Sequence, residues 1–85
     1  MEHRLVTCTV SAGMFTDEYY VIVEGEPVSS AYVNQRNLVT HTGSKGQVRA
    51  YLIRESADQA LIELPGEAVV GGLRTWVPKS LLTTG

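Results

Sequence analysis

The 85-residue sequence has little of what marks a disulfide-stabilised, metal-binding or membrane-spanning protein. Its single cysteine, Cys8, cannot form an internal disulfide, and no group of Cys and His residues has the spacing of a metal site. No apolar run approaches the roughly 20 residues that a helix needs to cross a bilayer. The sequence therefore predicts no structural disulfide, no bound metal and no contact with a membrane.

The chain also has fewer basic than acidic residues. Seven Lys and Arg residues stand against nine Asp and Glu, which gives a net charge of −2. Nucleic-acid-binding domains usually carry a basic patch and an excess of positive charge, so this balance argues against a nucleic-acid partner. The first residues, Met1–Arg4, lack the basic region and apolar stretch of a signal peptide, so a cytoplasmic location is expected.

The length and composition predict one small globular domain over residues 1–85. The hydrophobic fraction is 44% and the charged fraction 19%, which is typical of folded rather than disordered chains. Because a core of this size supplies limited stability, we expect the protein to bury more surface by self-association, most simply as a homodimer.

Apolar residues recur with period two in short runs separated by Gly, Ser, Asn and Asp, which is a strand pattern. In the first run, Val6, Cys8 and Val10 should point to one side and Thr7 and Thr9 to the other. A helix is arguable only within 54–64, where Pro65-Gly66 favours a strand and turn instead. The sequence predicts an all-β fold whose six strands are Arg4–Ser11, Glu18–Glu24, Ser29–Asn34, Gln47–Glu55, Gln59–Leu64 and Leu73–Val77.

The two halves of the chain, about 4–39 and 47–82, resemble each other. At an offset of 41 residues, "DEYYVIVEGEPV" aligns with "DQALIELPGEAV" with four identities in twelve, against roughly one expected by chance. Two three-strand repeats predict a six-stranded barrel with pseudo-twofold symmetry, which leaves few free edges. The alternative is that any two three-strand meanders look alike.

The stretch "TWVPKSLL" predicts where the last strand ends and which residues cover the end of the sheet. Proline offers no ladder donor and fixes φ, so the last strand should stop at Pro78 and continue as a short 3-10 turn. Leu81 and Leu82 can then fold back over an open end of the sheet. Trp76 aligns with Tyr32 of the first half, and we expect it to be at least half buried where the two halves meet.

A strand followed by proline and a one-turn plug resembles the C-terminal end of SH3-like barrels. Together "GMFTDEYYVIV", "ALIELPGEAV" and "WVPKSLL" are similar to small uncharacterised bacterial SH3-like β-barrel proteins of mobile elements. Plasmid-borne dihydrofolate reductases of SH3-like fold are functional relatives of that group, which implies an enzyme with an oligomeric pore as one reading. Their active-site run Val-Gln-Ile-Tyr is replaced here by "LRTW" at Leu73–Trp76, which argues against that activity.

Candidate chemistry is sparse. The acidic residues fall at predicted strand ends and turns, where they serve solubility, and "GSKG" at 43–46 lacks the spacing and following helix of a phosphate loop. Cys8 lies on the apolar side of its strand and reads as a small core residue. The sequence therefore predicts no catalytic residues, no cofactor and no enzyme.

The aromatic residues carry the strongest functional signal, because "YYVIV" and "AYLI" are apolar on both faces of their strands. The predicted interface is an outward patch of Tyr20, Ile22, Tyr51, Ile53 and Trp76. The alternative is that end loops or the C-terminal turn with Leu81 and Leu82 cover this patch. Arginines and a lysine could rim this surface and hold single-stranded nucleic acid: Arg36, Arg49, Arg54, Arg74 and Lys79. A non-enzymatic protein-interaction or self-associating module is the leading prediction, nucleic-acid binding the alternative and a reductase-like enzyme the third.

Overall fold

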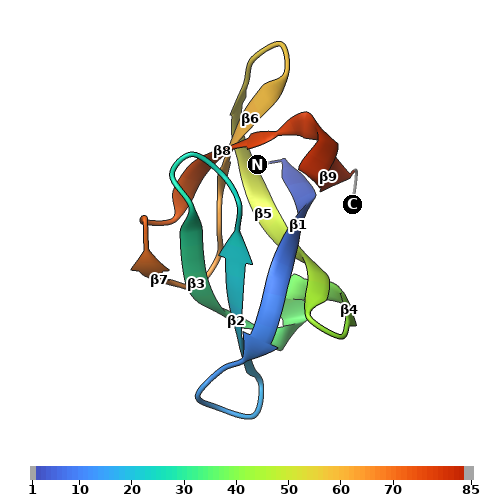
Figure 1. Cartoon of the computed structure of the whole chain (residues 1–85), viewed down its shortest axis with the longest axis vertical. Helices are drawn as coiled ribbons and strands as arrows, with labels where there is room; N and C mark the ends of the chain where they lie inside the picture. The colour runs from blue at the N-terminus through green and yellow to red at the C-terminus, as the bar shows by residue number, and fades with distance from the viewer. Residues whose placement is uncertain (1, 84–85) are drawn as a thin grey trace.

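Period-two alternation along the chain builds one curled antiparallel sheet in the computed structural model, which describes residues 2–83 (Figure 1). The described residues form nine strands and two 3-10 turns: β1 (His3–Ala12), β2 (Glu18–Val23), β3 (Ser29–Asn34), η1 (Gln35–Asn37), β4 (Leu38–Thr42), β5 (Lys45–Glu55), β6 (Gln59–Glu63), β7 (Glu67–Val70), β8 (Arg74–Pro78), η2 (Lys79–Leu81) and β9 (Leu82–Thr83). The all-β prediction is confirmed. Among these residues no helix has the length and apolar character that crossing a membrane requires.

The strand order along the sheet is β7-β3-β2-β1-β5-β6-β8, with β4 added beside β5 and β9 beside β1. The long strands β1 and β5 pair at the centre, from His3 opposite Tyr51 to Thr9 opposite Lys45. Their hairpins, β1–β2 and β5–β6, project at opposite ends of the molecule, which measures 38 × 23 × 23 Å (Figure 1).

Six of the nine strands coincide with the six predicted segments to within about two residues, while β4, β7 and β9 are additional. These three are short, and β4 and β7 are mostly or wholly exposed, so they carry no alternation that sequence reasoning could detect. They form because β5, β3 and β1 have backbone N–H and C=O groups to which β4, β7 and β9 respectively can hydrogen-bond. The sheet therefore has more strands than a six-stranded barrel.

Both halves of the chain run through the same order of pairings. After β3, turn η1 leads into β4, which lies on β5; after β8, turn η2 leads into β9, which lies on β1. Glu67 pairs with Tyr32, and Glu26 pairs with Trp76 in the corresponding place. The predicted 3-10 turn after Pro78 is confirmed, because η2 begins at the next residue.

The core lies inside the curl and is built from the inward residues of every long strand. The predicted inward set of β1 (Val6, Cys8 and Val10) is buried, as is Val48 of β5. Around them pack the other buried apolar residues: Val21, Val23, Ala31, Val33, Ala50, Ala60, Ile62, Leu64 and Val77. The outward residues of the strands are consequently the ones that lie on the surface of the curl.

A two-bond bridge links the β2–β3 turn to β8 across the opening of the curl. Glu26 N donates to Trp76 O at 2.8 Å, and Trp76 N donates to Glu26 O at 3.1 Å. Thr75, which is fully buried, donates its hydroxyl to the carbonyl of Pro27. Trp76 itself is largely covered, as predicted, at the place where the two halves of the chain meet.

Candidate interaction surfaces

Tyr20 and Ile22, two of the five predicted interface residues, lie side by side on the outward face of β2. Because Val21 and Val23 of the same strand point into the core, alternation turns Tyr20 and Ile22 outward. Tyr20 stands opposite Tyr32 of β3, with ring centroids 5.4 Å apart. This contact covers part of both rings, so the pair is partly buried rather than fully exposed.

Tyr51 and Ile53 lie on β5, on the other side of β1. Tyr51 stands opposite His3 near the start of β1, and the two rings are 4.7 Å apart. Tyr20 stands opposite Ser11 near the far end of the same strand. Ile53 falls at a shift in the β5–β6 register, between Leu52 and Arg54.

Trp76 occupies a third position, on β8 opposite Leu61 of β6. The five predicted residues are thus distributed over three strands, β2, β5 and β8. Tyr20 and Ile22 form one group, whereas Trp76 is separated from β5 by the whole of β6.

The most exposed apolar side chains lie elsewhere, at the turn between β1 and β2. Met14 is 71% exposed and Phe15 is 68% exposed. The turn is held by hydrogen bonds from Gly13 N to Glu18 O, from Glu18 N to Phe15 O and from Met14 N to Glu18 Oε1, all 3.0 to 3.1 Å long. The signal that sequence reasoning missed is the apolar pair inside "GMFTD", a turn bounded by Gly and Asp.

A second exposed apolar group lies along β7 and the neighbouring β2–β3 turn. Val28, Val69 and Val70 are 45%, 48% and 56% exposed. The three are neighbours because Val70 pairs with Ser30 and a Cβ on Gly71 would stand 2.1 Å from the carbonyl oxygen of Val28. We call these three residues the valine edge. Its sequence signal is "AVVGG", an apolar run ended by two glycines.

The basic residues of the nucleic-acid alternative are not gathered in one place. Arg74 pairs with Glu63 at 2.7 Å, and Lys79 pairs with Glu55 at 3.4 Å. Both ion pairs are exposed, and each lowers the local positive potential.

The remaining arginines of that set are spread along the chain. Arg49 and Arg54 both lie on β5, opposite Leu5 of β1 and Leu61 of β6 respectively. Arg36 lies in η1, where its carbonyl accepts a long hydrogen bond from Arg49.

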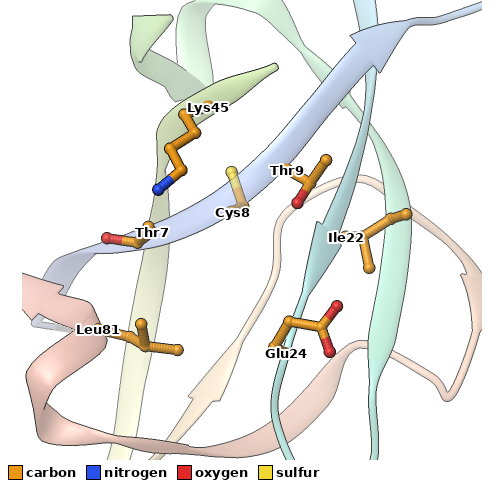
Figure 2. Close-up of a pocket in the computed structure, with 7 residues that line it drawn as sticks. All are labelled: Thr7, Cys8, Thr9, Ile22, Glu24, Lys45 and Leu81. Carbon is orange, nitrogen blue, oxygen red and sulfur yellow. The ribbon is translucent and has the colours of Figure 1, made fainter.

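A shallow depression of about 100 Å³ lies where β1, β2, β5 and η2 meet (Figure 2). Its walls come from both sides of β1: Thr7, Cys8, Thr9, Ile22, Glu24, Lys45 and Leu81. Sites for small molecules usually hold roughly 300 Å³ or more, so this depression is too small for a substrate of ordinary size. Burial raises the pKa of the Cys8 thiol to about 11, which keeps the group protonated near neutral pH.

No family model matches this chain, and neither the comparison with curated proteins nor that with solved structures finds a similar protein. The geometry of the surface is therefore what a functional proposal has to rest on.

Proposed function

We propose that the protein is a non-enzymatic module that self-associates and binds other proteins through apolar surface. The observation that carries the proposal is the placement of its exposed apolar side chains. Among residues 2–83 six large ones are exposed, and five of them gather at two places, the β1–β2 turn and the valine edge. Scattered apolar residues are ordinary on a monomer, but grouped ones mark interaction sites.

The backbone under both groups supports this proposal. The β1–β2 turn has its own hydrogen bonds, and the valine edge is built on strand pairing with β3. A surface that is already ordered loses little conformational freedom when a partner binds. Hydrogen-bonded backbone thus underlies both groups of exposed side chains.

Two further observations favour binding over catalysis. The Cys8 thiol is buried and protonated, so it offers no thiolate nucleophile near neutral pH. The segment that aligns with the reductase active-site run makes structural contacts. Arg74 is paired with Glu63, and its neighbour Thr75 is fully buried against the β2–β3 turn, so both side chains are already engaged within the chain.

The size of the exposed groups sets the expected affinity. Stable interfaces use about 20–30 residues on each side, far more than either group provides. We therefore expect self-association with a dissociation constant between about 1 µM and 1 mM. The association should be transient and visible only at high protein concentration.

Sedimentation equilibrium over about 10 µM to 1 mM protein tests the proposal. The average mass should rise from the monomer value of 9.3 kDa toward that of a dimer as concentration increases. A mass that stays at the monomer value throughout would contradict self-association.

A gel shift with single-stranded DNA at low salt tests the nucleic-acid alternative, because phosphate contacts are strongest at low salt. We expect no shift.

A further inference from the structure

Strand β7 is an open edge of the sheet. It is the first strand of the sheet order, and within the described part of the chain it pairs with β3 on one side only, in keeping with its position outside β3 in Figure 1. All four of its residues, Glu67–Val70, are exposed. Edge strands are usually protected by Lys, Pro or a covering loop, because their free N–H and C=O groups recruit other strands. Within β7 the only charge is Glu67 and there is no proline, and its one irregularity is a register shift in the pairing with β3, between Ser30 and Ala31.

The edge is held in strand geometry at both ends. Gly66 and Gly71 have φ of +94° and +74°, in the region that favours glycine. A Cβ on Gly66 would stand 2.0 Å from the carbonyl oxygen of Tyr32, and one on Gly71 would be as close to that of Val28. The two glycines therefore let β7 approach β3 closely, and pairing with another strand requires little further ordering.

We propose that β7 pairs in antiparallel fashion with β7 of a second copy of this chain, which joins two sheets into one. This inference rests on the proposed function and names the surface and partner of the self-association. The charge pattern selects this arrangement. In an antiparallel pair each Glu67 lies near the partner's Val70, so the two carboxylates are at opposite ends of the ladder. A parallel pair would set them side by side, which is unfavourable.

The same pattern selects a second copy over a foreign peptide. A strand that is apolar with one charge at one end is complementary to itself under a twofold axis, which is the usual symmetry of dimers. The β1–β2 turn lacks this self-complementarity, because two residues at a tip need a separate pocket to enter.

Val69→Lys in the full chain tests the proposal, since an edge lysine is the device that natural sheets use against pairing. Val39→Lys on β4 is the matched control. Val39 is 42% exposed against 48% for Val69, and the two substitutions change the net charge equally. Strand β4 lies on the opposite side of the molecule from β7 (Figure 1). We expect Val69→Lys to weaken the association at least about tenfold in sedimentation equilibrium, and Val39→Lys to change it less than about twofold.

The outcomes separate the two proposals. If Val69→Lys associates like the wild type while Phe15→Ser is monomeric, the β7 inference is wrong and self-association stands. If the wild type is monomeric, both proposals fail.

A measurement on the unmodified chain guards against misfolding of the variant. In ¹H–¹⁵N spectra over a dilution series, the largest chemical-shift changes should fall at 67–72. Changes confined to other residues would overturn the inference.

Discussion

Replacing Gly25 by Ala should weaken the bridge that closes the curled sheet. Gly25 precedes Glu26, whose backbone forms both hydrogen bonds to Trp76. A Cβ at this position would stand 2.2 Å from the Thr75 hydroxyl oxygen and 2.7 Å from the carbonyl oxygen of Trp76. Neither neighbour can yield easily, because Thr75 is fully buried and the other atom belongs to the backbone.

The cost follows from these contacts. Overpacking a tight site costs about 1–3 kcal/mol, and displacing the turn also weakens hydrogen bonds worth about 1 kcal/mol each. We therefore expect Gly25→Ala to lower the free energy of unfolding by about 3 kcal/mol. A domain of this size has about 4–13 kcal/mol in total, so the loss is a large part of its stability.

Gly43→Ala is the control that separates steric clash from backbone strain. Gly43 has a φ of +62°, but a Cβ there would meet nothing within 4 Å. Left-handed strain alone costs about 1 kcal/mol. Urea unfolding followed by circular dichroism and by Trp76 fluorescence should show Gly25→Ala to be less stable than Gly43→Ala by about 2 kcal/mol. Equal losses in the two variants would refute the steric reasoning.

Buried polar groups and the thiol give the remaining predictions. The Ser30 hydroxyl is buried and has no hydrogen-bond partner among residues 2–83, so Ser30→Ala should leave the protein as stable or up to about 1 kcal/mol more stable. Thr75→Val, which removes the shorter of the two side-chain hydrogen bonds that the Pro27 carbonyl accepts, should instead cost about 1–2 kcal/mol. The same urea titrations decide, and a stabilised Thr75→Val would contradict the assignment. Burial raises the pKa of Cys8 from 9.0 to about 11, so the folded state holds its proton longer and stability should fall as pH rises from about 9 to 11. Cys8→Ala should lose that slope, and rapid alkylation of native Cys8 at pH 8 would contradict its burial.

Local alternation was enough to predict the long strands. Val6, Cys8 and Val10 face the core as expected, because side chains of a strand alternate whatever its partner is. Proline was equally informative: the turn after Pro78 follows from its fixed φ and missing donor. Both features depend on the residues themselves and their immediate neighbours.

The candidate surfaces were harder to predict, because exposure depends on neighbouring strands. Tyr20 was expected to stand in one outward patch with Trp76, but Tyr32 covers part of the Tyr20 ring and Trp76 is itself largely covered on β8. The valine edge was missed since "AVV" has no alternation, and nothing local shows that its strand lies outermost.

By itself the sequence determined the strand class, the positions of six strands and, for the first strand, the side that faces the core, all of which follow from period-two patterning and turn residues within a few positions. Only the tertiary structure decided which strands pair, that Glu26 and Trp76 meet, and that β7 keeps a free edge. The pairs Tyr32–Glu67 and Glu26–Trp76 join residues 35 and 50 positions apart, and they depend on how the whole sheet curls rather than on any segment of it.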